Sequence, residues 1–132
     1  MSVVRILLVD DEVEFTRNLS MLLTKRGYEV TAVHDGTSAI GLADGSEFDV
    51  VLLDLKMPGL DGIETLKSLK KKKPLLEVII LTGHGSVDTA IEGVEQGAFD
   101  YAMKPFNLAD LTERIRLAFE RKLLHEKKAG LK

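Results

Sequence analysis

Short apolar runs alternate along the chain with segments in which apolar residues recur at helical spacing. The short runs are rich in β-branched residues, and they predict strands at residues 3–9, 29–33, 49–54, 78–82 and 101–103. The helical segments lie between and after them, at residues 15–23, 37–43, 61–73, 86–96 and 107–119. Five β/α units with short connections predict an α/β fold, a doubly wound parallel sheet with right-handed crossovers.

Residues that favour turns and helix ends separate these elements. The expected caps and stops are Gly27, Gly45, Asp61 with Glu64, Ser86, Gly97 and Asn107, and Pro58-Gly59 marks a turn. With 132 residues the chain has the size of one ordinary domain. We expect that domain at residues 1–120. The mostly charged residues 121–132 are expected to form a helical extension or the start of a linker.

The composition excludes several classes of function. There is no cysteine, so disulfides and thiolate metal sites are absent, and a reducing cytoplasm is the expected location. His34, His84 and His125 lack the spacing of zinc ligands, and no P-loop motif occurs. The first apolar run reaches Asp10 too soon for a signal peptide or a membrane span, so no membrane contact is expected. The net charge of −3 argues against direct nucleic-acid binding.

Four of the predicted strands end on polar residues that suit phosphoryl chemistry. They end at Asp10-Asp11, Asp54, Thr82 and Lys104-Pro105. The carboxyl ends of parallel strands meet at one edge of a sheet, where open α/β folds bind ligands. Two like charges about 4 Å apart repel by roughly 4 kcal/mol at an effective dielectric constant of 20. A hard cation relieves that repulsion, and oxygen ligands suit Mg²⁺. The alternative is that Asp10 or Asp11 only caps the first helix.

Asp54 is the candidate nucleophile, since a carboxylate can attack a phosphoryl group and form an acyl phosphate. Lys104 and Mg²⁺ would neutralise the charge, and the Thr82 hydroxyl could bond a phosphoryl oxygen. The alternatives are that Asp54 is a turn residue and that Lys104 is solvated. A cis peptide before Pro105 could turn Lys104 into the crevice, but only about 5–6% of such bonds are cis, so the sequence does not establish it.

In combination, four motifs resemble the receiver (REC) domain of bacterial two-component response regulators. They are LLVDDE, VVLLDLKMPGLDGIE, VIILTGHG and GAFDYAMKPF. The stretch from Thr82 to Phe106 is most similar to receivers of nitrogen-regulation-type transcriptional activators. The resemblance implies a flavodoxin-like (βα)5 fold with strand order 2-1-3-4-5. It also implies either a stand-alone receiver or a piece of a longer regulator.

The resemblance assigns roles to individual residues. Asp10 and Asp11 would be the acidic pair, with Asp11 a direct metal ligand. Asp54 would be phosphorylated, and Lys56 would lend its backbone carbonyl to Mg²⁺.

Three further residues would sense and transmit the modification, again by resemblance. Thr82 and Lys104 would contact the phosphoryl group, and Tyr101 would swing inward when Thr82 moves. The surface formed by the fourth helix, fifth strand and fifth helix would then change.

The implied function is a switch operated by Mg²⁺-dependent phosphorylation of Asp54. The implied partners are a sensor histidine kinase, an output domain or downstream protein, and a second copy after phosphorylation. The protein would catalyse its own phosphorylation and slow dephosphorylation without turning over an external substrate, so it would not be an enzyme in the usual sense.

An aspartyl-phosphate phosphohydrolase is the first alternative function, although residues 10–14 do not match its DxDx[TV] pattern. The second is a flavin-binding module, which two carboxylates after the first strand disfavour.

Overall fold

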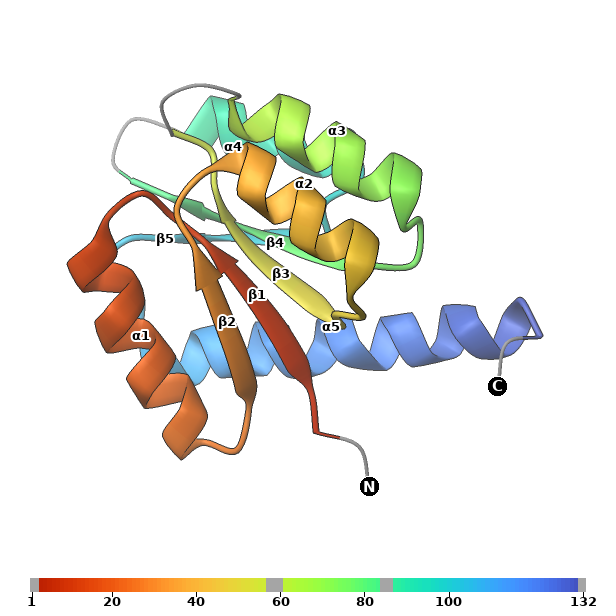
Figure 1. Ribbon diagram of the computed structural model, residues 1–132, viewed down its shortest axis with the longest axis horizontal. Helices are drawn as coiled ribbons and strands as arrows, with labels where there is room; N and C mark the ends of the chain where they lie inside the picture. The colour runs from red at the N-terminus through yellow and green to blue at the C-terminus, as the bar shows by residue number, and fades with distance from the viewer. Residues whose placement is uncertain (1–2, 57–60, 84–86, 131–132) are drawn as a thin grey trace.

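The structure, a computed structural model, describes residues 3–56, 61–83 and 87–130. Strands and helices alternate along the described chain, as the hydrophobic pattern predicts (Figure 1). Their bounds are β1 Arg5–Val9, α1 Val13–Lys25, β2 Glu29–Val33, α2 Gly36–Gly45, β3 Val50–Asp54, α3 Gly62–Lys72, β4 Glu77–Thr82, α4 Val87–Glu95, β5 Asp100–Met103 and α5 Leu108–Lys128.

The strands form one parallel sheet in the order β2-β1-β3-β4-β5, which confirms the predicted topology. Val9 at the end of β1 lies level with Val33 of β2 and Leu53 of β3. On the other side, Thr82 of β4 lies level with Met103 of β5. The residues that follow these positions therefore emerge along the same edge of the sheet.

Alternate residues of the central strands are buried on opposite faces of the sheet. Leu7, Val51 and Ile80 belong to the core under α2, α3 and α4. Ile6 and Leu52, from the same central strands, belong to the core under α1 and α5. Figure 1 shows the same two helical layers. Burial on both faces explains why these strands are continuous apolar runs instead of alternating ones.

Most element boundaries differ from the predicted ones by one or two residues, but α5 ends at Lys128, nine residues past the predicted end at residue 119. β1 begins at Arg5 rather than at residue 3, β3 begins at Val50, and β4 and β5 each begin one residue earlier than predicted. α2 runs from residue 36 because the Asp35 side chain accepts a hydrogen bond from the Ser38 amide, which caps the helix one residue early. Gly45 is the last residue of that helix and not its stop.

The predicted stops and caps elsewhere agree with the structure. Gly27 and Gly97 have φ of 94° and 116°, the left-handed conformation that glycine adopts without strain. Asp61 caps α3 through the Glu64 amide, and the Asn107 side chain accepts from two amides of α5. The Pro58-Gly59 turn and the Ser86 cap lie outside the described residues.

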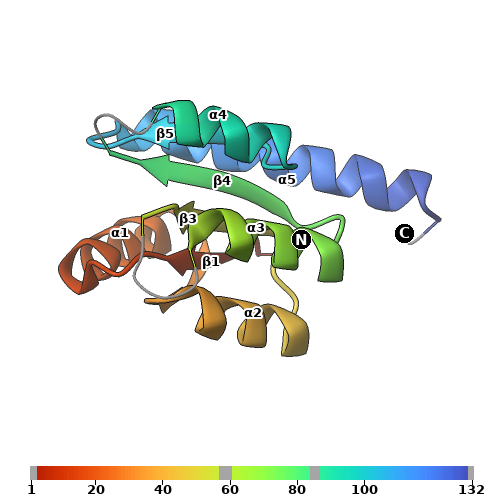
Figure 2. The same cartoon turned by 90° about the horizontal axis from the view of Figure 1, so that it is seen from above.

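The last helix continues well past the sheet (Figures 1 and 2). It is unbroken from Leu108 to Lys128, so no helix end separates residues 1–120 from the described part of the extension. Arg121 and Lys122, from that extension, form ion pairs with Glu77 and Asp49 beside the amino ends of β4 and β3. Among the described helices, α5 included, none is long and apolar enough to cross a bilayer.

Gly62, the first residue of α3, packs directly against the backbone that follows Asp54. A Cβ atom at this position would lie 2.3 Å from the Leu55 Cα atom, and a backbone atom cannot move away cheaply. We therefore expect Gly62→Ala to lower the free energy of unfolding by about 2–3 kcal/mol in urea titrations. Gly41→Ala is the control, because no atom lies within 4 Å of its added Cβ. This helical position should gain up to about 1 kcal/mol. Equal changes in the free energy of unfolding for Gly62→Ala and Gly41→Ala would contradict the close packing of Gly62.

Candidate functional site

The sheet brings the polar strand ends together at its carboxyl edge. Asp10 directly follows Val9, which pairs with Leu53, the residue before Asp54. On the other side of β3, the Lys104 amide donates a hydrogen bond to the Thr82 carbonyl oxygen at 2.6 Å. The parallel register thus places these side chains in one crevice, as the sequence predicted.

Three carboxylates meet in this crevice. Oxygen atoms of Asp10, Asp11 and Asp54 all lie within 4.8 Å of one another. Asp10 is fully buried and Asp54 is 7% exposed, whereas Asp11 is open to solvent. A set of oxygen ligands with one open side fits a hard divalent cation that keeps some of its water.

The alternative that an aspartate of the pair only caps α1 does not agree with the structure. The N-cap residue is Glu12, and its side chain makes no capping hydrogen bond. Asp10 instead accepts the Glu12 amide through Oδ1 at 2.9 Å, which fixes its carboxylate at the sheet edge. Asp54 is held in a similar way, because its Oδ1 accepts the Lys56 amide at 3.0 Å.

Burial raises the pKa of Asp54 to about 6, against the ordinary value of 3.8. The hydrogen bond from the Lys56 amide opposes this shift, the charge of Asp10 adds to it, and the charges of Lys104 and Asp11 have smaller effects of opposite sign. The folded protein therefore holds Asp54 in an environment that disfavours its negative charge until a cation is present.

Lys104 lies in the crevice, and the peptide bond between Lys104 and Pro105 is cis. Its ammonium group donates to Asp10 at 2.7 Å and contacts Glu12 at 3.2 Å. Within the described chain, no ion pair joins it to Asp54. Burial lowers the pKa of Lys104, but the hydrogen bond and charge of Asp10, with smaller effects of Asp54 and Glu12, outweigh it and raise that pKa above its ordinary value. Lys104 is therefore a partly buried, paired cation and not a solvated one.

The remaining predicted residues, Thr82 and Tyr101, lie on the neighbouring strands β4 and β5. The Thr82 side chain is fully buried, and its hydroxyl lies 3.3 Å from the Gly83 carbonyl oxygen. Tyr101 is half-buried and packs against the core under α4. Sequence reasoning missed the contacts of Glu12 and Phe15 with Lys104. No local signal marks them, because these residues are about 90 positions away along the chain.

The raised pKa of Asp54 predicts a pH-dependent loss of stability without metal. Between pH 3.8 and about 6 the folded state binds more protons than the unfolded chain, so stability falls as pH rises through this window. Asp54→Asn should therefore stabilise the metal-free protein by on the order of 2 kcal/mol at pH 7, and by little at pH 4. Urea titrations at both pH values, with the exposed Asp44→Asn as control, measure this. If Asp54→Asn raised the free energy of unfolding equally at pH 4 and pH 7, the result would contradict a raised pKa of Asp54.

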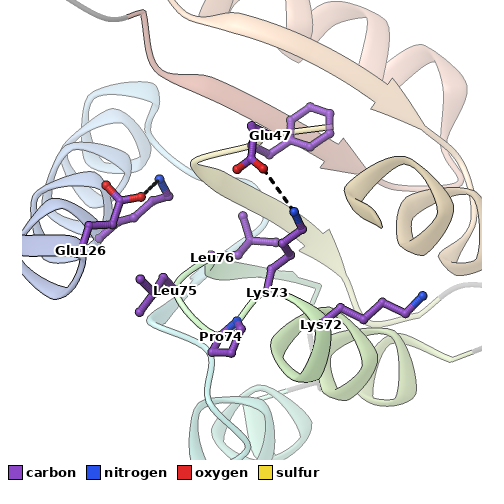
Figure 3. A pocket seen from close by; sticks show the side chains of 9 residues that line it. Glu47, Lys72, Lys73, Pro74, Leu75, Leu76 and Glu126 are labelled. Carbon is purple, nitrogen blue, oxygen red and sulfur yellow. Dashed lines mark hydrogen bonds and ion pairs between the residues drawn. The ribbon is translucent and has the colours of Figure 1, made fainter. Parts of the chain in front are cut away.

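A pocket lies at the opposite edge of the sheet, where the strands begin (Figure 3). It has a volume of about 200 Å³, and Phe48, Leu75 and Leu76, which precede β3 and β4, contribute to its lining. The three lysines around it are already paired, Lys72 with Asp44, Lys73 with Glu47 and Lys122 with Glu126. This pocket lies away from the cluster of Asp10, Asp11 and Asp54, and it adds nothing to the chemistry of that cluster.

Comparison with known proteins agrees with this geometry. A family model of the response regulator receiver domain matches residues 6–116. The chain is 42% identical over 113 residues to the transcriptional regulatory protein TcrA of Mycobacterium tuberculosis, covering 86% of this chain and 45% of TcrA. It is 45% identical over 117 residues to the transcriptional regulatory protein CpxR of Escherichia coli, covering 89% of this chain and 50% of CpxR. The chain thus spans about half the length of these curated relatives.

A solved structure shows the same architecture. The receiver domain of NtrX from Brucella abortus matches with a TM-score of 0.84 and 34% identity, covering 87% of this chain and 98% of that domain. The chain therefore belongs to the response regulator receiver domain family of two-component signalling, whose general function is phosphorylation on an aspartate.

Proposed function

We propose that Asp54 is the residue that accepts the phosphoryl group, from the phosphohistidine of a sensor histidine kinase. The observation that carries this proposal is the meeting of the three carboxylates at the sheet edge, with Lys104 bound to one of them. Asp54 is the member of the cluster that ends the central strand β3, between the acidic pair on one side and Thr82 on the other.

Asp10, Asp11 and Asp54 would hold the Mg²⁺ ion, together with the backbone carbonyl oxygen of Lys56. The all-oxygen set and its one exposed member support this choice of metal. When bound, the cation would neutralise the carboxylates and the charge of the incoming phosphoryl group.

The chain's own residues would carry the transfer. A lone pair on an Asp54 carboxylate oxygen attacks phosphorus, the new oxygen–phosphorus bond forms, and the bond to the donor's nitrogen breaks with its electron pair leaving on the imidazole. Lys104, held at the crevice by Asp10, would stabilise the phosphoryl oxygens, and the Thr82 hydroxyl would donate to one of them. Attack of water on phosphorus would later release phosphate, and no external substrate would be turned over.

The conformational change would be transmitted from Thr82 to Tyr101. Movement of the Thr82 hydroxyl toward the phosphoryl group would vacate space that the half-buried Tyr101 ring can fill. The surface of α4, β5 and α5 would then change and bias the binding of a partner. Exposed Ile91 and the paired, exposed Arg116 lie on these helices.

The partners of this surface would be an output domain or a downstream protein, and a second copy of the chain after phosphorylation. The length of the curated relatives, about twice the matched part, supports an output domain. The resemblance of residues 82–106 to receivers of the nitrogen-regulation type supports a regulator of that group. We place the domain in the cytoplasm, without nucleic-acid or membrane contacts of its own, in keeping with its lack of cysteine and its net negative charge.

Mg²⁺ should raise the thermal midpoint of the unmodified protein, because the ion binds the folded cluster and not the dispersed acids of the unfolded chain. In metal-free buffer, Asp11→Asn should raise the midpoint by relieving repulsion, and it should abolish the further rise with Mg²⁺. Differential scanning calorimetry with and without the metal measures both effects. A metal-free Asp11→Asn protein that melts below the parent would count against a repulsive acidic cluster.

A further inference from the structure

Among the described residues, three side chains hold the ammonium group of Lys104, and two of them are acidic. Besides Asp10 and Glu12, it lies over the face of the Phe15 ring, 4.3 Å from the ring centroid. The negative face of an aromatic ring attracts a cation at this distance. Phe15 is half-buried in the first turn of α1, so its ring is fixed by the helix that follows the acidic pair.

The Phe15 ring is itself held by the segment that carries Lys104. Phe106 packs against it edge-to-face, with ring centroids 6.0 Å apart and an interplanar angle of 71°. The two rings, Lys104, Pro105 and Glu12 line a pocket of about 470 Å³ beside the carboxylates. The aromatic pair thus joins the start of α1 to the loop between β5 and α5.

The three partners of Lys104 differ in how well they can hold it during the reaction. A metal ion bound by Asp10 would share that carboxylate's charge and repel the ammonium group. The side chain of Glu12 is 66% exposed, and ion pairs at that exposure contribute little and weaken with salt. The ring face of Phe15 carries no charge that the metal could take up, so its attraction persists when the cation binds.

We propose that Phe15 is a positioning residue that orients Lys104 toward the phosphoryl group on Asp54. This inference rests on the proposed function, because it takes Lys104 as the cation that neutralises the phosphoryl oxygens. Lysine has a long, flexible side chain, and without the ring its ammonium group would spread over more rotamers. Phe15 touches neither the donor nor the phosphoryl group in this scheme and acts only through Lys104.

The test compares phosphorylation rates with acetyl phosphate at saturating Mg²⁺, followed by intact-protein mass spectrometry. Phe15→Leu keeps an apolar side chain but removes the ring, and it should slow phosphorylation about 3- to 10-fold. Phe15→Tyr retains the ring face and should restore the parent rate to within twofold. Phe119→Leu is the matched control, since Phe119 is another half-buried ring packed on the same core, and its rate should not change.

Two further measurements separate positioning from a general loss of structure. In a Lys104→Met background, adding Phe15→Leu should cause no further slowing. In NMR spectra, the side-chain methylene protons beside the Lys104 ammonium should be shifted upfield by the ring current in the parent and in Phe15→Tyr, and not in Phe15→Leu. A second Phe15→Leu slowing in the Lys104→Met protein, or an unshifted Lys104 in the parent, would overturn the proposal.

The outcome is separable from that of the proposed function. If Asp54→Asn removes the label while Phe15→Leu reacts as fast as the parent, the phosphoryl site stands and the positioning role fails. If the label remains on the Asp54→Asn protein, the proposed site itself fails. Because the Lys104 NMR signal does not depend on phosphorylation, it tests the ring contact in either case.

Discussion

Asp54→Asn is expected to reduce phosphoryl labelling by acetyl phosphate in Mg²⁺ to background. The amide has nearly the shape of the carboxylate, but it is uncharged and a far weaker nucleophile, so the acyl phosphate should not form. Intact-protein mass spectrometry, followed by peptide mapping of the parent, measures the label and its position. Asp44→Asn, which changes an exposed carboxylate paired with Lys72 on α3, should label like the parent.

This loss could not be attributed to unfolding. Asp54→Asn removes a negative charge whose burial raises the pKa of Asp54, so it should stabilise the metal-free fold. A stable Asp54→Asn protein that carries undiminished phosphate would exclude Asp54 as the acceptor. A parent that labels equally well after removal of Mg²⁺ with a chelator would exclude the metal from the reaction.

Arg121→Met is expected to lower the free energy of unfolding by about 3 kcal/mol. Glu77, at the start of β4, is 1% exposed, and Arg121 binds both of its carboxylate oxygens, at 2.5 and 2.6 Å. The guanidinium group also stacks 4.6 Å from the centroid of the Phe99 ring. Removal of the arginine would leave a buried carboxylate without its main partner, and burying such a charge is costly.

Arg116→Met is the control for this prediction. Arg116 also forms close pairs, with Glu113 and Glu120 at 2.6 and 2.5 Å, but all three side chains are about half exposed. Its loss should therefore change the free energy of unfolding by less than about 1 kcal/mol. The double variant Glu77→Leu with Arg121→Met should recover most of the stability lost in the single variant. Urea titrations of the parent, the two single variants and the double variant measure these free energies of unfolding. Equal losses of stability for Arg121→Met and Arg116→Met would contradict the role of burial.

The Arg121 pair also bears on the C-terminal extension. The family match ends at residue 116, yet the helix continues and its side chains at positions 121 and 122 bind acids beside the start of the sheet. Lys122 is 8% exposed and contacts Asp49 at 3.1 Å. The described part of the extension is thus anchored to the domain. Whether residues 121–132 lead into a linker stays a prediction.

Much of the fold could be predicted from the sequence because two local regularities carry it. Buried parallel strands are short, continuous apolar runs, and helices repeat their apolar residues every three or four positions. Caps such as Asp61 and Asn107 also act over three residues or fewer. Leu22 shows the limit of such patterns, because it belongs to the apolar spacing of α1 and yet is 45% exposed.

The place of the candidate site could be predicted from the order of the strands along the chain. Once the strands are parallel, the side chains of Asp10, Asp54 and Thr82 must emerge at one edge, whatever the details of packing. The partners of the charged side chains at this edge, in contrast, depend on how the helices pack. Besides Asp10, Lys104 binds Glu12 and the Phe15 ring rather than Asp54. These contacts join residues about 90 positions apart, and they depend on the angles at which packed helices present their side chains, which no local pattern records.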